Sequence, residues 1–158
     1  MINSKKGVTE RPFSVSVSDQ MDYFKPNMSA AELNAFSMLA LAHIGDAVFE
    51  MMTRAALCKE GHTSVQELHR RTTARVNAPA QAEAAGRVLP FLTEEESAIY
   101  RRGRNTHVNS VPHAANVGQY HAATGLEALF GWLYLQGRTE RLNELFTALN
   151  ARVPEEEN

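Results

Sequence analysis

Two long apolar segments stand out in the chain, and each contains an isolated acidic residue. Residues 35–52 read AFSMLALAHIGDAVFEMM, with Asp46 among small and apolar neighbours. Residues 122–135 read AATGLEALFGWLYL, and Glu127 is the only charged residue there. Both segments predict helices of the protein core, where an unpartnered carboxylate costs free energy because it loses its hydration. Each of these two acids therefore needs a partner in the folded protein.

Capping and breaking residues predict five further helices around these two. Ser29 followed by Glu32 has the spacing of a capping box, and Thr93 precedes three glutamates that favour the positive end of a helix dipole. Gly103 is expected to end the helix that follows Thr93. The predicted helices span residues 29–34, 35–59, 63 or 64 to 75, 77–89, 93–102, 117 or 119 to 136, and 139–151. Only the short piece FSVSVSD at residues 13–19 alternates as a strand would, and no convincing strand is predicted, so the predicted class is all-α.

The chain is long enough for one domain with a substantial core. Its 158 residues are 44% hydrophobic and 22% charged, as is usual for a soluble globular protein. Residues 1–28 are polar and lack a helical period, which predicts a partly disordered N-terminal extension. Residues 29–151 form the predicted domain, and residues 152–158 form an acidic tail.

Charge and cysteine content narrow the classes of partner and compartment. The formal net charge is −2, so any nucleic-acid surface has to be a local basic patch. Cys58 is the only cysteine, which excludes an internal disulfide and a cysteine-based zinc site and favours a cytoplasmic setting. No secretory signal is apparent, and an acid such as Asp46 at a membrane midplane costs about 2.5 kcal/mol or more. We therefore expect no membrane span.

Asp46 and Glu127 predict a site for Mg²⁺ shared by two helices. Small residues flank both acids, so the two helices can approach closely. Mg²⁺ takes oxygen ligands and keeps several waters, and it can generate hydroxide and stabilise charge on a phosphodiester under attack. The alternative is that each acid pairs with an arginine from elsewhere or lies at a subunit seam. Glu50, one turn after Asp46, either serves in the outer shell of the metal or pairs with Arg54.

A cluster of arginines predicts contact with the phosphates of a nucleic acid. The candidate RNA-binding residues are Arg101, Arg102, Arg104, Asn105, His107 and Asn109. Guanidinium groups and amides suit phosphate oxygens and sugar hydroxyls, through which RNA duplexes are mainly recognised. The alternative is a solvated helix end on which the dipole favours arginine. A second basic group, which either extends this surface or is an ordinary outer face, consists of His69, Arg70, Arg71 and Arg75.

Four motifs resemble the catalytic domain of the ribonuclease III family. They are HIGDAVFE at residues 43–50, VNAPAQA at 76–82, RRGRN at 101–105 and TGLEALFGWLYL at 124–135. The closest resemblance is to the bacterial Mini-ribonuclease III branch, which has the catalytic domain but no double-stranded-RNA-binding domain. The similarity covers residues 29–149, and it implies the helical bundle of the ribonuclease III catalytic domain.

The resemblance implies roles for individual residues. Asp46 is similar to the family's catalytic aspartate and Glu127 to its metal-binding glutamate. Full-length ribonuclease III enzymes carry two more acids, at positions where this chain has Ala42 and Thr124. The Mini branch also lacks both, so the number of bound Mg²⁺ ions is left open. Residues 101–112 resemble the family's RNA-binding loop, although their middle, THVNSVP, is less basic than the family pattern.

The resemblance also implies partners and a product. The family implies a homodimer in which each subunit cuts one strand of an RNA duplex and leaves 5′-phosphate and 3′-hydroxyl ends. The implied substrate is the paired stem of the large-subunit ribosomal RNA precursor, with a large-subunit ribosomal protein as a further partner. The prediction is therefore a Mg²⁺-dependent, double-strand-specific endoribonuclease.

Two other classes of function are kept as alternatives. The first is a catalytically silent RNA-binding or ribosome-assembly module with the same fold, which would have no reason to keep Asp46 and Glu127. The second is an all-helical phosphohydrolase of small nucleotides. That class usually has His–Asp pairs on a helix, and this chain offers His43 and Asp46 without a second such pair.

Overall fold

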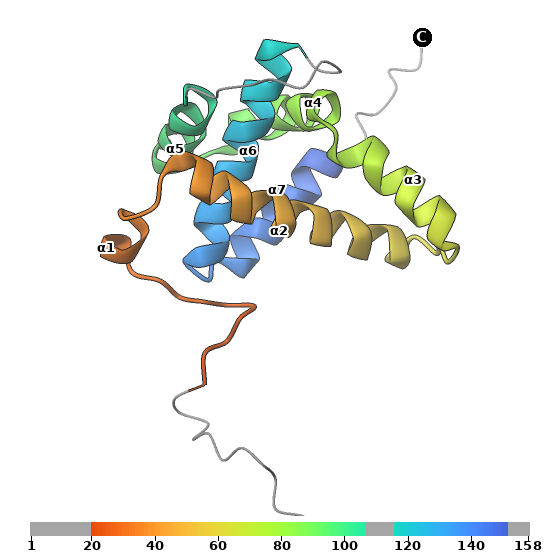
Figure 1. The fold of residues 1–158 in the computed structure, drawn as a ribbon, viewed down its shortest axis with the longest axis horizontal. Helices are drawn as coiled ribbons and strands as arrows, with labels where there is room; N and C mark the ends of the chain where they lie inside the picture. The colour runs from red at the N-terminus through yellow and green to blue at the C-terminus, as the bar shows by residue number, and fades with distance from the viewer. Residues whose placement is uncertain (1–19, 107–115, 152–158) are drawn as a thin grey trace, which may run out of the picture.

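The computed structural model describes residues 20–106 and 116–151, and within these ranges the chain forms helices and no strand (Figure 1). The helices are α1 (Ala30–Leu33), α2 (Met38–Lys59), α3 (Val65–Val76), α4 (Ala78–Val88), the 3₁₀ helix η2 (Leu89–Phe91), α5 (Glu94–Arg104), α6 (Val117–Leu135) and α7 (Thr139–Asn150). The all-α prediction is confirmed. The predicted disorder of residues 1–19 and the acidic tail 152–158 lie outside the described residues. No helix within the described ranges is both long enough and apolar enough to cross a membrane.

The helix α6 is the centre of the fold. From Ala123 to Leu135, every residue except Glu127 and Tyr134 is buried. The helices α2, α4 and α5 pack against it from different sides, and α7 lies beside it (Figure 1). A helix that is apolar on nearly all faces has to be surrounded in this way. Glu127 is thus a charged residue on an otherwise buried part of the central helix.

The helices α2 and α6 cross in backbone contact. A Cβ atom at Gly45 would lie 1.6 Å from the carbonyl oxygen of Glu127, and one at Gly131 would lie 2.0 Å from the carbonyl oxygen of Leu41. Real Cβ atoms never approach backbone so closely, so both glycines are needed for this crossing. The prediction that small residues allow the two acid-bearing helices to approach closely is confirmed.

The long helix α2 begins at Met38 rather than at residue 35, so this predicted boundary is wrong. The side chain of Ser37 accepts a hydrogen bond from the backbone N–H of Ala40 at 3.1 Å. A serine in this role satisfies one of the unpaired amides of the first turn and fixes where the helix starts. Because the residues just before Ser37 are also apolar, the sequence did not indicate that the helix begins after Ser37.

The end of α5 differs from the prediction as well. The helix continues through Gly103 to Arg104. A Cβ atom at Gly103 would lie 2.8 Å from the Cβ of Ala128, so this glycine permits close packing on α6 and does not end the helix. The candidate RNA-binding arginines are consequently on the last turns of a helix that is packed firmly against α6.

Part of the predicted extension is tied to the C-terminal end of α6. The backbone N–H of Met28 donates a hydrogen bond to the carbonyl oxygen of Leu135 at 2.7 Å. The hydroxyl of Tyr134 donates to the carbonyl oxygen of Tyr23. Two hydrogen bonds, at Tyr23 and Met28, therefore attach this segment to the end of the central helix.

Candidate active site

Asp46 and Glu127 lie next to the point where α2 crosses α6. Gly45, which precedes Asp46, contacts the backbone of Glu127 directly. The side chain of Asp46 is exposed and that of Glu127 is partly exposed, whereas Val48 and Phe49 on α2 are buried. The expectation that Asp46 lies inside the core is therefore wrong, because it occupies the outer face of α2. The crossing brings the two predicted acids together at the surface.

The two carboxyl groups disfavour each other's negative charge. Burial raises the pKa of Glu127 to about 7, and the charge of Asp46 is the second cause, while the amide of Gln81 acts in the opposite direction. The pKa of Asp46 is also raised, first by loss of hydration at its carboxyl and then by Glu50, against the attraction of His43. Asp46 is exposed as a whole, yet the neighbouring helices remove part of the water around its carboxyl. A cation between the two acids would favour their charged forms.

In the part of the chain that the structure describes, neither acid forms an ion pair with a basic side chain. None of the ion pairs in residues 20–106 and 116–151 involves Asp46 or Glu127. The alternative that each acid is neutralised by an arginine from elsewhere in the chain is thus wrong for the described residues. Two neighbouring carboxylates that form no ion pair with a cationic side chain offer the oxygen ligands that a hard divalent cation prefers.

Ala42 and Thr124, which occupy the positions of further acids in full-length ribonuclease III enzymes, add no charge to the site. Ala42 is buried, and the hydroxyl of Thr124 donates a hydrogen bond to the carbonyl oxygen of Tyr120 at 3.0 Å. Within the part of the chain that the structure describes, no three His, Cys, Asp or Glu side chains gather as a metal-binding group. The described site therefore consists of two carboxylates.

Gln81 is a site residue that the sequence analysis did not single out. Its side chain is only 1% exposed on α4, and its amide lies near enough to Glu127 to lower the pKa of that carboxyl. However, Nε2 of Gln81 has no acceptor at hydrogen-bonding geometry among the described residues. The contact between the Gln81 amide and the Glu127 carboxyl is therefore not a full hydrogen bond. The sequence could have indicated Gln81, because the helical spacing places this polar residue on the same helix face as Ala84 and Ala85.

Glu50 forms an ion pair with Arg54 on the next turn of α2. This pairing is one of the two roles predicted for Glu50, and it is confirmed. The other role, in the outer shell of a metal, stays a prediction. The charge of Glu50 nevertheless contributes to the raised pKa of Asp46.

The three arginines at the end of α5 are exposed and have no carboxylate partner among the described residues. Arg101, Arg102 and Arg104 take part in none of the ion pairs between described residues. The Nε of Arg104 donates a hydrogen bond to Oδ1 of Asn105 at 3.3 Å. These side chains are therefore available to phosphates. His107 and Asn109, the other predicted RNA-binding residues, lie outside the described residues.

The second basic group differs from the first because its charges are largely compensated. Arg71 pairs with Glu67 at 2.8 Å, and Arg75 pairs with Glu60 at 2.9 Å. Compensated arginines attract a polyanion less than free ones do. An ordinary outer face is thus the better description of this part of α3.

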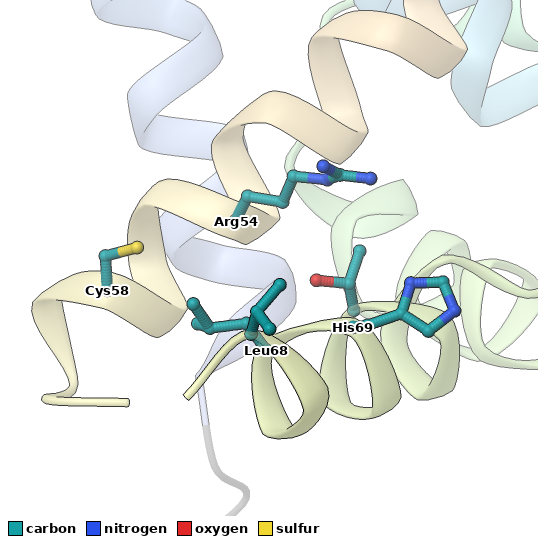
Figure 2. A pocket seen from close by; sticks show the side chains of 6 residues that line it. Arg54, Cys58, Leu68 and His69 are labelled. Carbon is teal, nitrogen blue, oxygen red and sulfur yellow. The ribbon is translucent and has the colours of Figure 1, made fainter. Parts of the chain in front are cut away.

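A separate apolar pocket lies between the C-terminal half of α2 and α3. Figure 2 shows Arg54 and Cys58 on α2, facing Leu68 and His69 on α3. The pocket has a volume of about 250 Å³, and its lining contains no carboxylate. It is therefore a different feature from the Asp46–Glu127 site and does not offer ligands for a hard cation.

Comparisons with known proteins identify the family to which the chain belongs. The family model described as "Ribonuclease III domain" matches residues 39–138, which include both acids. The chain is 44% identical over 110 residues to the Mini-ribonuclease 3 of Symbiobacterium thermophilum, covering 70% of this chain and 85% of the relative. It is 42% identical over 119 residues to the Mini-ribonuclease 3 of Enterococcus faecalis, covering 74% of this chain and 90% of the relative.

A solved structure has the same arrangement of helices. The crystal structure of protein FN1578 from Fusobacterium nucleatum superimposes with a TM-score of 0.67 at 29% sequence identity. The match covers 73% of this chain and 93% of the other. The chain therefore belongs to the ribonuclease III domain family and, within it, to the Mini-ribonuclease 3 group.

Proposed function

We propose that the chain is a Mg²⁺-dependent endoribonuclease that cleaves double-stranded RNA in the cytoplasm. Membership of the ribonuclease III domain family supports endonucleolytic cleavage of an RNA duplex. The observation that carries the proposal is the pair of unpartnered acids, Asp46 and Glu127, at the crossing of α2 and α6. A protein that only bound RNA would gain nothing from two like charges held together at its surface.

The residues of the site fit a divalent cation such as Mg²⁺. Asp46 and Glu127 would hold it, because both offer carboxylate oxygens and both have a raised pKa that a nearby cation would lower. When bound, the cation supplies activation of water and neutralisation of charge at the phosphodiester. Cleavage of the bond between phosphorus and O3′ leaves 5′-phosphate and 3′-hydroxyl ends.

The exposed arginines of α5 would position the substrate. Arg101, Arg102 and Arg104 pair with no carboxylate of the described residues and lie at the end of a helix that packs on α6. A hollow of about 550 Å³ between the end of α5 and the start of α6 is lined by Arg104, Asn105, Thr106, Gly118 and His121. A phosphate backbone that entered this hollow would meet a guanidinium group and an amide.

A homodimer would allow one protein to cut both strands. The exposed side of α2 near Asp46 includes Ala47 and Met51, and Met51 is 46% exposed. A second copy of the chain that covered these apolar residues would bring two Asp46–Glu127 sites together. Each site would then cut one strand of the duplex.

The family resemblance supports a particular substrate. We propose the paired stem of the large-subunit ribosomal RNA precursor, with a large-subunit ribosomal protein bound to the same RNA as a further partner. The support is the similarity to the Mini-ribonuclease 3 proteins over 70% or more of the chain.

The experiment compares cleavage of a long RNA duplex by the wild type, Asp46→Asn and Glu127→Gln in the presence of Mg²⁺. Glu83→Gln is the matched control, because Glu83 is an exposed glutamate of α4 that pairs with Arg87. We expect both site variants to lose more than about 100-fold in rate, and the control to keep wild-type activity. An intact duplex with the wild type, or wild-type cleavage by Asp46→Asn, would contradict the proposal. Binding without cleavage would instead favour the silent RNA-binding module.

A further inference from the structure

The buried face of α4 contains a polar residue that packing alone does not require. This face consists of Gln81, Ala84, Ala85 and Val88, at positions i, i+3, i+4 and i+7, and each of them is at most 4% exposed. The helix α4 packs with α6, the helix that bears Glu127. Gln81 is the only polar side chain among the four.

The amide of Gln81 is costly at this position. Its Nε2 has no acceptor at hydrogen-bonding geometry among the described residues. A buried donor without an acceptor destabilises the folded state because it has lost its hydrogen bonds to water. An unbranched apolar side chain such as methionine would fill a similar volume without this cost. The amide therefore requires an explanation other than stability.

Glu127 provides that explanation, because its carboxylate is an acceptor beside the amide. The Gln81 amide acts on this carboxyl as a hydrogen-bond donor would, although the geometry falls short of a full bond. The two residues come from different helices, so a bond between them would fix the Glu127 side chain relative to α4. Asp46, in contrast, reaches the site from α2 on the exposed side.

We propose that Gln81 is a positioning residue for Glu127, whose carboxylate it holds in the direction of Asp46 by donating from Nε2. The inference rests on the proposed function, since it assigns Gln81 to the same pair of acids. Hydrogen bonds to metal-binding carboxylates commonly change metal affinity by 10- to 100-fold. Gln81 would thus act on metal affinity without contacting the RNA.

The test uses the full chain and replaces the amide by an apolar side chain of similar size. Gln81→Met removes the donor, and Gln81→Leu repeats the removal with another shape in case the first variant folds poorly. Val88→Ala is the matched control on the same buried face, because it weakens packing without altering an amide. Three quantities are measured: Mn²⁺ affinity by electron paramagnetic resonance without RNA, the Mg²⁺ concentration for half-maximal cleavage, and the Tm of the metal-free chain.

We expect Gln81→Met to bind Mn²⁺ at least tenfold more weakly, to need a similarly higher Mg²⁺ concentration, and to have an unchanged or higher Tm. Val88→Ala should lower the Tm and leave both metal readouts at the wild-type value. Wild-type Mn²⁺ affinity in both Gln81 variants would overturn the inference, as would an equal loss of affinity in Val88→Ala. If the wild type failed to cut RNA while Gln81→Met still weakened Mn²⁺ binding, the proposed function would fail and the positioning role would stand.

Discussion

At the scale of single residues, the site contains two acids, Asp46 and Glu127, that form no ion pair with the described residues. Another acid of the protein, Glu96, does form an ion pair and serves as a comparison. Glu96 is fully buried, but it caps α5 and its carboxylate pairs with Arg141 at 2.8 Å. The hydrogen bond from Arg141 holds the pKa of Glu96 below its usual value. Glu127 has no such partner in the described parts of the chain, and its pKa is raised to about 7. Glu96 is thus an acid whose charge its neighbours stabilise, whereas the charge of Glu127 would be stabilised by the metal that we propose.

We expect Glu127→Gln to stabilise the metal-free protein at pH 8. In the wild type the pKa of Glu127 is about 7 in the folded chain, against 4.5 as its ordinary value. The folded state therefore holds the proton more tightly, and stability falls as the pH rises from about 4.5 to about 7. Allowing for the partial exposure of Glu127, the variant should gain about 2 kcal/mol at pH 8. Urea unfolding between pH 4.5 and 8 in the presence of a chelator measures the difference.

Asp46→Asn serves as the companion variant in this titration. Because the charge of Asp46 is one cause of the raised pKa of Glu127, its removal should move that pKa below 7. Carbon NMR of the Glu127 carboxyl follows the shift directly. A difference in stability between the wild type and Glu127→Gln that stays constant from pH 4.5 to pH 8 would contradict the raised pKa.

At the scale of elements, the crossing of α2 and α6 decides where the acids meet. Gly45 and Gly131 let the two backbones touch, and Phe49 of α2 packs edge-on against Phe130 of α6 with ring centroids 5.4 Å apart. Any side chain at the two glycines would separate the helices. The same contact that holds the core together therefore sets the spacing between Asp46 and the turn that bears Glu127.

We expect Gly131→Ala to destabilise the protein by about 3 kcal/mol, because its Cβ would lie 2.0 Å from the carbonyl oxygen of Leu41. Gly86→Ala on α4 is the matched control, since no atom lies within 4 Å of the added Cβ. A helical alanine restricts the unfolded chain, so this control should gain about 0.5–1 kcal/mol. Urea unfolding monitored by circular dichroism compares the two variants. Equal stability of both variants would show that the crossing tolerates a side chain.

The arginines at the end of α5 lead to a prediction about salt dependence. Replacing Arg101, Arg102 and Arg104 together by alanine should weaken duplex binding and reduce the slope of log affinity against log salt by about one for each lost phosphate contact. Arg71→Ala is the control, because Arg71 already pairs with Glu67. Fluorescence anisotropy with a labelled duplex, in Ca²⁺ to prevent cleavage, measures both slopes. A triple variant with the wild-type slope would exclude these residues from the RNA surface.

The sequence predicted the elements well because local signals determine them. The capping boxes of Ser29 and Thr93 are present. Asp46 and Glu127, from two apolar helices, lie near enough for the charge of Asp46 to raise the pKa of Glu127. What it did not reveal depends on contacts between distant segments. Nothing local distinguishes Gly103, which packs on α6, from a glycine that ends a helix, and nothing local shows that Gln81 faces Glu127. Such features follow from the tertiary arrangement alone.

At the scale of the whole molecule, the outer side of α2 combines the acid of the site with exposed apolar side chains. A shallow pocket there is lined by Phe24, Ile44, Ala47, Val48, Met51 and Tyr134. Phe24 is 71% exposed and Met51 is 46% exposed. Contiguous apolar surface of this kind on a soluble chain is typical of contact with another protein. A homodimer that brings two Asp46–Glu127 sites together would need an apolar contact surface at this position, beside Asp46.

The last prediction tests this surface with two charge insertions. Met51→Glu would place one carboxylate from each subunit in the apolar contact, and the pair of unpaired charges should weaken a homodimer at least tenfold. Val65→Glu is the matched control, because Val65 is a 77% exposed apolar residue on α3, outside the lining of this pocket. Sedimentation velocity should find the wild type and the control at twice the chain mass of 17.5 kDa, and Met51→Glu shifted toward the single chain. Because Asp46 and Glu127 belong to the same chain, the separated variant should still bind Mn²⁺ but lose coordinated cleavage of both strands. A Met51→Glu protein that stays dimeric would place the contact elsewhere on the molecule, and the pairing of the two sites across α2 would then be wrong.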